Sequence, residues 1–234
     1  MKLLAFDTST EYLSLALMLE DKISTFDVLA GQSHSQLILP QIQTLLAAAG
    51  VQLQDLQGLA FGAGPGSFTG VRIAAGVAQG LGFGANLPVA GICTLQALAE
   101  ASGADKVIAC LDARMGEVYH AVYVKNAGTC KTGTWQTVIE PGLYKPDAVP
   151  TIEGSDWVGA GSGWQTYGEV LSHAYQDQLQ EVLPELLPSA SAIMRLAQPL
   201  FTSGQPLPAS AAMPIYIRNR VALKTVEREQ SLRL

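Results

Sequence analysis

A glycine-rich segment, residues 58–88, is the first candidate for chemistry, because a glycine-rich loop that leads into a helix often binds phosphate. It reads GLAFGAGPGSFTGVRIAAGVAQGLGFGANLP. A Walker loop requires a lysine that reaches the terminal phosphates, and GAGPGSFTGVR has none. A dinucleotide-binding loop requires a third glycine where Ser67 stands. Backbone N–H groups at a helix start capped by Ser67 or Thr69 can still bind an anion, but the sequence favours packing as the role of these glycines.

Small residues recur along the helix that we expect from residue 69 to residue 84. Gly76, Gly80 and Gly84 follow one another at intervals of four residues, although each interior glycine costs a helix about 1 kcal/mol relative to alanine. Such spacing forms a shallow groove in which a second helix can lie close. The sequence leaves open whether this groove holds the chain's own first helix or a helix of another protein.

The elements that must position these residues alternate between strands and helices. An earlier helix is expected from Ser33 to Gly50, with a bend or a late start at Pro40. Its apolar stripe consists of Leu37, Ile38, Ile42, Leu45, Leu46 and Ala49. Further strands are expected at LQGLAFGAG, LPVAGI and WVGAGSGW, and further helices at YGEVLSHAYQ and SASAIMRLAQPLF.

The chain also repeats itself. An apolar strand ends in Asp7, and a second apolar strand ends in Asp112. Each is followed by a turn and an alternating strand, which is typical of a β-hairpin. This repeat indicates a duplication at the scale of a lobe. We therefore expect an α/β protein with an N-terminal lobe at 1–100 and a C-terminal lobe at 101–234.

Composition excludes several classes of protein. The chain has 234 residues, a net charge of −6, three cysteines and three histidines, so a disulfide framework and a histidine-rich metal site are not expected. No stretch has the ~20 apolar residues that span a bilayer, and Asp7 comes too early for a signal peptide, so a cytoplasmic protein is expected. Residues 218–234 carry a net charge of +3 and would form either a basic contact for RNA or an acidic partner, or a solvated terminus.

Several residues allow both a functional and a structural interpretation. Asp7 would position a metal-bound water or a phosphate, or cap its turn, and the sequence favours the turn. Arg114 would hold an acidic group across the lobes or pair with Glu117. Arg72 is expected to be an interface or capping cation. His34 lies beside two serines, but no G-x-S-x-G elbow occurs for a serine hydrolase.

Five separated motifs carry a resemblance along the whole chain: DTST, SHSQLILP, GAGPGSFTGVR, LDARMGEVY and PIYIRNRVA. In this order they resemble the TsaB family, formerly YeaZ, of tRNA threonylcarbamoyladenosine biosynthesis proteins. The resemblance implies a bilobal fold of the actin-like ATPase superfamily, with two duplicated lobes that each contain a mixed sheet and helices. This agrees with the repeat found independently in the sequence.

The catalytic relative TsaD is similar from the AGPG turn onward and then carries a metal-binding H-x-E-G-H element. Thr94 and Leu98 stand here where its two histidines would fall, and a leucine cannot bind a metal. The resemblance therefore implies a vestigial nucleotide cleft with no catalytic residue and no metal of its own. That cleft would comprise Asp7, Thr8, Ser9, Asp112 and Arg114.

The resemblance further implies an accessory subunit without cofactors. It would pair with TsaD, join the ATPase TsaE in a ternary complex, and support the transfer of threonylcarbamoyl to N6 of adenosine 37 in tRNAs that read ANN codons. Nucleotide and metal are expected on TsaD or at the shared interface, tRNA only as part of the complex, and a homodimer when the chain is alone. The expected partner surface consists of Leu37, Ile38, Gln41, Ile42, Leu45, Arg72, Ala75, Gly76, Gln79, Gly80 and Phe83.

Two other functions stay open at this point. A small-molecule kinase or ATPase of the same fold would bind or hydrolyse nucleotide as an isolated chain. A protease that acts on TsaD would require a nucleophile and base that the motifs do not supply.

Overall fold

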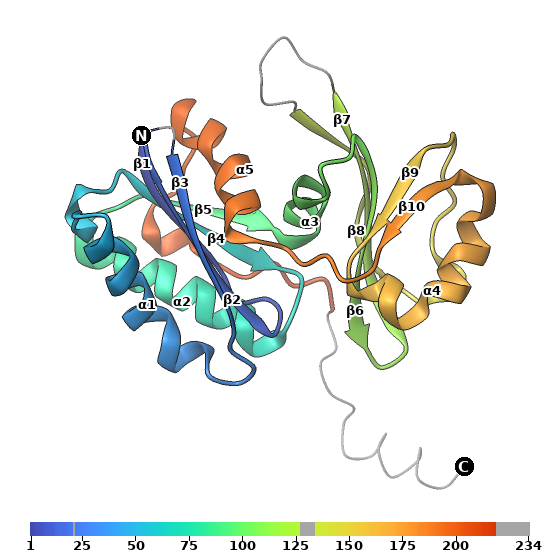
Figure 1. Cartoon of the computed structure of the whole chain (residues 1–234), viewed down its shortest axis with the longest axis horizontal. Helices are drawn as coiled ribbons and strands as arrows, with labels where there is room; N and C mark the ends of the chain where they lie inside the picture. The colour runs from blue at the N-terminus through green and yellow to red at the C-terminus, as the bar shows by residue number, and fades with distance from the viewer. Residues whose placement is uncertain (21, 127–133, 219–234) are drawn as a thin grey trace, which may run out of the picture.

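Two five-stranded sheets, each covered by helices, form two lobes side by side in the computed structural model (Figure 1). The structure describes residues 1–20, 22–126 and 134–218. Strands and helices alternate in both lobes, which confirms the α/β, two-lobed fold class. In the part of the chain that is described, no helix combines the length and the apolar character needed to cross a membrane.

The first sheet has the strand order β3-β2-β1-β4-β5, in which β1 pairs antiparallel with β2 and parallel with β4. Helices cover both faces of this sheet. Because successive side chains of a strand point to opposite faces, one strand contributes to two cores. Leu4 and Phe6 of β1 face one core with α1 and α2, whereas Leu3 and Ala5 face a second core with α5. The elements are β1 (Lys2–Asp7), β2 (Tyr12–Leu19), β3 (Lys22–Leu29), α1 (His34–Ala48), β4 (Gly58–Gly64), α2 (Phe68–Ala85) and β5 (Val89–Cys93).

The second sheet repeats the first in the order β10-β9-β6-β7-β8. Strand β6 pairs antiparallel with β7 and parallel with β9, as β1 pairs with β2 and β4 in the first sheet. The predicted duplication is therefore confirmed. The elements are α3 (Thr94–Ser102), β6 (Lys106–Arg114), β7 (Glu117–Asn126), β8 (Thr134–Tyr144), β9 (Trp157–Ala160), α4 (Ser162–Tyr175), β10 (Leu179–Leu183) and α5 (Ala190–Thr202).

Two helices exchange places between the lobes. Helix α3 follows the first sheet in sequence, but Leu95 and Leu98 pack with Val107 and Ala109 of the second. Helix α5 follows the second sheet, but Ile193 and its neighbours pack on β1 of the first. Both helices lie between the sheets (Figure 1). The division into 1–100 and 101–234 stays a prediction. The structure adds that α3 packs on the second sheet and α5 on the first.

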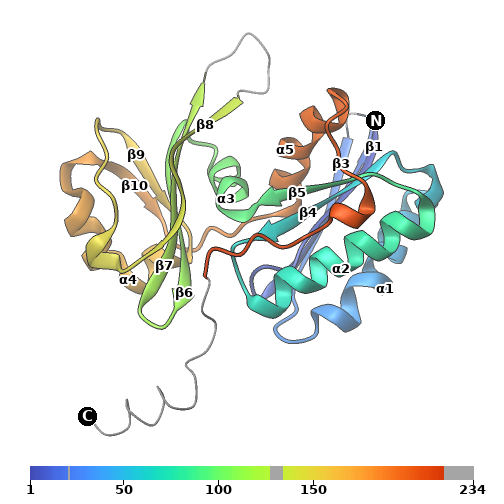
Figure 2. The same ribbon diagram turned by 180° about the vertical axis from the view of Figure 1, so that it is seen from behind.

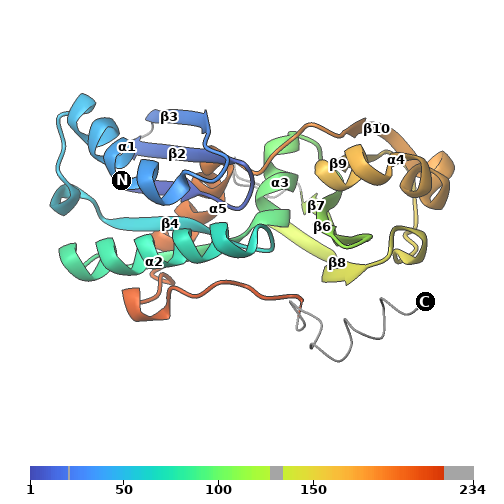
Figure 3. The same ribbon diagram turned by 90° about the horizontal axis from the view of Figure 1, so that it is seen from below.

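After α5 the chain returns along the first lobe. Leu207 pairs with Val89 at the edge of β5, and a 3-10 turn at Ala209–Ala211 packs on α2. We call the following residues, 212–218, the strap. Seen from below, this segment runs alongside α2 toward the second lobe (Figure 3). The view of Figure 2 shows the same segment leaving the first lobe and crossing toward the second.

Candidate functional site: the interlobe cleft and the outer face of α2

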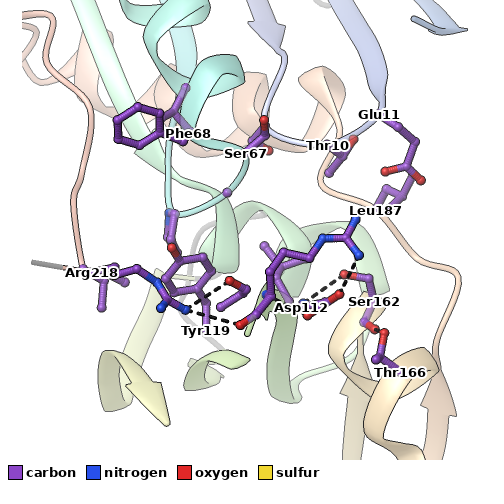
Figure 4. A pocket seen from close by; sticks show the side chains of 18 of the residues that line it. Thr10, Glu11, Ser67, Phe68, Asp112, Tyr119, Ser162, Thr166, Leu187 and Arg218 are labelled. Carbon is purple, nitrogen blue, oxygen red and sulfur yellow. Dashed lines mark hydrogen bonds and ion pairs between the residues drawn. The ribbon is translucent and has the colours of Figure 1, made fainter. Parts of the chain in front are cut away.

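A cleft of about 570 Å³ lies between the lobes. Its walls come from the ends of β1 and β6, the starts of α2 and α4, and the strap (Figure 4). Figure 4 shows Ser67, Thr10 and Glu11 on the first-lobe side and Asp112, Ser162 and Thr166 on the second-lobe side. Among the described residues, no group of three or more His, Cys, Asp or Glu side chains lies close enough together to hold a metal ion.

The turn after β1 is buried and internally bonded. Asp7 is 1% exposed, and its Oδ2 accepts hydrogen bonds from Ser9 N at 3.1 Å and Ser9 Oγ at 2.8 Å. Thr8 Oγ1 donates to the backbone oxygen of Gly70 at 2.7 Å, which ties the turn to α2. Asp7 therefore caps its own turn, as the structural interpretation of the sequence expected.

The second carboxylate oxygen of Asp7, Oδ1, is buried without a hydrogen-bond partner. It lies against Gly62, where a Cβ would collide with it and would also lie 3.3 Å from Ile193. Desolvation raises the pKa of Asp7 to about 6, against the hydrogen bonds from Ser9 that lower it. Asp7 is not among the residues that line the cleft, so this oxygen faces the protein interior.

The corresponding turn after β6 carries the predicted Asp112 and Arg114. Arg114 donates from its backbone N to Asp112 Oδ1 at 2.8 Å and from Nη1 to Asp112 Oδ2 at 3.1 Å. In the described part of the chain, Arg114 adopts neither predicted arrangement: its partner is Asp112, and Glu117 pairs with Arg218 instead. Asp112 N also donates to Ser162 Oγ at the start of α4.

Helix α2 begins at the cleft, and Ser67 is its N-cap, with Ser67 Oγ accepting from Gly70 N at 3.4 Å. This helix start could attract an anion. Among the described residues, the charged side chains that line the cleft are Glu11, Asp112, Arg114 and Arg218, and no lysine is among them. Both arginines are already in ion pairs. The described cleft therefore offers no unpaired cationic side chain to bind the phosphates of a nucleoside triphosphate.

Thr94 and Leu98, which stand at the metal-binding positions of the catalytic relative, are fully buried. Thr94 Oγ1 donates a short hydrogen bond to the backbone oxygen of Pro65. Leu98 packs in the core between α3 and the second sheet, where a Cβ at Gly161 would lie 2.5 Å from it. Both positions are therefore filled by packing.

The predicted partner surface on α1 and α2 divides into two groups. Ile38, Ile42 and Ala75 were predicted to face a partner, and this prediction is wrong, because they are 1%, 3% and 5% exposed and belong to the chain's own core. They occupy the helix faces that pack inward on the first sheet. The remaining predicted residues are exposed or half-buried: Leu37, Gln41, Leu45, Arg72, Gly76, Gln79, Gly80 and Phe83.

The glycines of α2 serve two different purposes. Inner glycines allow close approach, since a Cβ at Gly70 would collide with the Thr8 oxygen and one at Gly82 would lie 2.7 Å from Ala209 Cβ. A Cβ at Gly76, Gly80 or Gly84 would meet nothing within 4 Å. Helix α1 therefore does not fill this groove, which settles one alternative that the sequence left open.

The other predicted candidates have structural partners. Arg72 Nη1 donates to the Phe68 oxygen at 2.9 Å, and its guanidinium lies 3.2 Å from the Phe68 ring centroid and 4.9 Å from that of Tyr216. His34 Nε2 lies 3.2 Å from the Tyr12 oxygen and fastens the start of α1 to β2. The basic tail beyond Arg218 lies outside the described residues.

Sequence reasoning missed the pair formed by Glu117 and Arg218 and the network around Glu100. Glu100 accepts from Arg195 Nε at 2.8 Å, Lys125 Nζ at 3.1 Å and Trp135 Nε1 at 2.8 Å. Each of these partners is distant in sequence, so no local spacing indicated them. The sequence shows the motif PIYIRNRVA, which contains Arg218, but it gives no sign that Arg218 pairs with Glu117.

Comparison with known proteins gives a consistent result. Residues 28–223 match the family model of TsaD, tRNA N6-adenosine threonylcarbamoyltransferase. The tRNA threonylcarbamoyladenosine biosynthesis protein TsaB of Escherichia coli (strain K12) is 39% identical, with 96% of this chain and 97% of that protein covered. TsaB of Haemophilus influenzae is 37% identical, with 95% of each covered.

Solved structures from Pseudomonas aeruginosa are also similar over nearly the whole chain. YeaZ has a TM-score of 0.83 at 37% identity, with 92% of this chain and 99% of that chain covered. A protein described as similar to peptidase YeaZ has a TM-score of 0.85 at 37% identity, with 93% and 99% covered. The chain belongs to the TsaB family of tRNA threonylcarbamoyladenosine biosynthesis proteins.

Proposed function

We propose that the chain is a non-catalytic accessory subunit that pairs with TsaD in the threonylcarbamoylation of adenosine 37 of ANN-decoding tRNAs. In this proposal TsaE joins the pair, tRNA binds only to the complex, and the chain works in the cytoplasm. Nucleotide and metal bind to TsaD or at the shared surface, and this chain supplies no cofactor site. When TsaD is absent, the same surface closes a homodimer.

The open groove on α2 is the observation that supports pairing most directly. Gly76, Gly80 and Gly84 leave the helix backbone uncovered, and Phe83 beside them is 65% exposed. A glycine in a helix interior costs about 1 kcal/mol relative to alanine, so three of them on an exposed face need a compensating role. Close approach of a partner helix is such a role.

The neighbouring half-buried side chains extend this groove onto α1. Leu37, Gln41 and Leu45 lie beside the buried stripe of that helix and remain accessible. Together with Arg72 and Gln79 they surround the α2 glycines with the mixture of apolar and polar groups that protein interfaces use. Two helices from each partner would then form a four-helix contact.

The absence of catalysis in this chain is supported by the residues at the expected catalytic positions and at the cleft. Thr94 and Leu98 are committed to packing, and the two cleft arginines are committed to ion pairs. Asp7 directs its free oxygen into the interior. No pair of nucleophile and base is evident among these residues.

The first test is light scattering on the purified chain, alone and with the TsaD of the same organism. We expect a self-paired species to give way to a one-to-one complex. Gly80→Leu should prevent both kinds of pairing, because its side chain would fill the groove. Gly168→Leu is the matched control, since Gly168 lies in α4 of the other lobe and a Cβ there also meets nothing within 4 Å. Pairing of Gly80→Leu at the strength of the native chain would overturn this location of the interface.

Peptidase activity is the alternative suggested by one structural relative, which is described as similar to a peptidase. It predicts that TsaD is cut in a purified mixture and that a serine-directed inhibitor stops the cleavage. Kinase or ATPase activity predicts that the isolated chain hydrolyses ATP. Intact TsaD and unhydrolysed ATP after prolonged incubation would exclude both and favour the accessory role.

A further inference from the structure

The strap, residues 212–218, contacts both lobes. On the first lobe, Ile215 N donates to the Ala63 oxygen at the end of β4, at 2.7 Å. The Ile215 oxygen lies so close to Gly64 that a Cβ there would stand 3.0 Å from it. This part of the strap is therefore fixed to the first sheet beside the cleft.

On the second lobe, the strap ends at the turn between β6 and β7. Arg218 Nη2 lies 2.8 Å from Glu117 Oε2 and donates to the Ala113 oxygen at 3.1 Å. The side chains of Arg218 and Glu117 are only 14% and 29% exposed, so solvent screens this pair less than a surface pair.

The turn that Arg218 contacts has an uncommon backbone. Arg114 and Met115 both have positive φ values, +61° and +59°, and such non-glycine residues persist only where their surroundings hold them. Asp112 holds the turn from within by accepting from Arg114 N. Arg218 holds it from outside through the Ala113 oxygen, so the strap also stabilises the turn that forms one wall of the cleft.

Between its two ends the strap touches α2. The Tyr216 ring lies 4.9 Å from the Arg72 guanidinium, which is stacked on Phe68. Ile215, Tyr216, Ile217 and Arg218 also line the cleft. The strap thus joins the start of α2, the cleft and the second lobe.

We propose that the strap is an interlobe latch that holds the cleft at one width, with the Arg218–Glu117 pair as its fastening. The exchanged helices α3 and α5 connect the lobes through their cores and act as the hinge. The strap is a separate tie at the cleft wall, and breaking its pair lets the lobes separate without unfolding either one. This inference concerns the isolated chain and holds whichever protein pairs with it.

The test measures the distance between spin labels on the two lobes of the full chain. One label is placed at Thr25→Cys on β3 and the other at Val170→Cys on α4, both at exposed positions, after Cys93→Ser and Cys130→Ser. Labelled chain is diluted with unlabelled chain so that only pairs within one molecule contribute. We expect Arg218→Glu and Glu117→Arg to lengthen and broaden the distance distribution, and the double exchange to restore it.

Arg114→Ala is the matched control, because it removes an adjacent arginine whose ion pair stays within one lobe. Arg218→Gln is a milder variant that decides the matter if the charge reversals do not fold, as judged by circular dichroism. A distribution in Arg218→Gln that equals the native one would overturn the latch. So would equal broadening in Arg114→Ala, since any lost charge at the turn would then suffice.

Discussion

Two buried titratable residues, Asp7 and His120, are the features at residue scale that have measurable consequences. Desolvation raises the pKa of Asp7 from 3.8 to about 6. Burial lowers the pKa of His120 from 6.5 to about 4. His120 is fully buried with its Nε2 2.7 Å from the Tyr175 hydroxyl, whereas its Nδ1 has no partner. Between about pH 4 and pH 6, each residue is therefore mostly neutral inside the fold, whereas in water it would be mostly charged.

The two residues affect stability in opposite directions. The pKa of folded Asp7 lies above its unfolded value, so its contribution to stability decreases as pH rises from about 4 to 6. The pKa of folded His120 lies below its unfolded value, so stability decreases as pH falls from about 6.5 to 4. Over most of this window the two contributions oppose each other.

Asp7→Asn should remove one of these contributions. The asparagine oxygen can still accept from Ser9, and no carboxylate has to be ionised in the interior. The free energy of unfolding of Asp7→Asn relative to the native chain should increase by about 2 kcal/mol between pH 4 and pH 7. Urea denaturation at several pH values measures this difference.

The sign of that pH dependence is the decisive observation. His120→Gln serves as the reference, because it should remove the loss of stability that His120 causes as pH falls from about 6.5 to 4. Parallel pH curves for Asp7→Asn and the native chain would show that Asp7 ionises freely in the folded state.

At the scale of elements, the two faces of α2 differ in the space that they leave for a side chain at a glycine position. Gly76 lies on the outer face, where an added Cβ meets nothing within 4 Å, and Gly82 lies on the inner face against Ala209. The spacing of the outer glycines is visible in the sequence. Which face each glycine occupies depends on the packing of the 3-10 turn at Ala209–Ala211, which no local pattern indicates.

Alanine substitutions on the two faces should therefore have opposite effects. Gly76→Ala should stabilise the monomer by about 1 kcal/mol, because alanine favours the helix. Gly82→Ala should destabilise it by about 1–3 kcal/mol, because its Cβ would overlap Ala209 Cβ at 2.7 Å. Urea denaturation of both variants measures the change, in a Gly80→Leu background if the native chain self-associates. A stabilising Gly82→Ala would mean that the turn moves away at little cost.

The elements that the sequence predicted are those with strong local signals. Strand β4 is a continuous apolar run, and α5 follows the N-cap Ser189, whose Oγ accepts from Ala192 N. The exposed edge strand β3 was missed because five of its eight residues are exposed and none is buried. Strand β8 was not expected because it contains Pro141 and Gly142. Helix α3 was not expected because its nine residues are too few for a clear period.

The candidate site was predictable only in part for the same reason. Asp7 and Asp112 follow apolar strands, so their positions at the strand ends could be inferred. The burial of Ile38 and Ile42 could not, because an apolar stripe on a helix is equally suited to its own core and to a partner. The ion pair of Glu117 with Arg218 depends on the path of the chain after α5.

At the scale of the whole molecule, the exchange of α3 and α5 joins the two lobes. Glu100 on α3 accepts from Arg195 on α5 and from Lys125 on the second sheet. Although burial acts to raise the pKa of Glu100, hydrogen bonds from Trp135, Arg195 and Lys125 hold it below its ordinary value. Neither lobe can bury its sheet without a helix from the other half of the sequence.

The whole chain should therefore unfold in a single transition. All three tryptophans, Trp135, Trp157 and Trp164, lie in the second lobe, so their fluorescence reports that lobe alone. Ile38→Ala removes a side chain that is 1% exposed in the core of the first lobe and should cost about 2–5 kcal/mol.

If the lobes are coupled, this remote change lowers the urea midpoint of tryptophan fluorescence as much as that of circular dichroism, which reports helices in both lobes. Val138→Ala is the control, because Val138 is 48% exposed on β8 and its loss should leave both midpoints nearly unchanged. A fluorescence midpoint that ignores Ile38→Ala would show that the second lobe folds independently, and the exchanged helices would then be a connection without thermodynamic coupling.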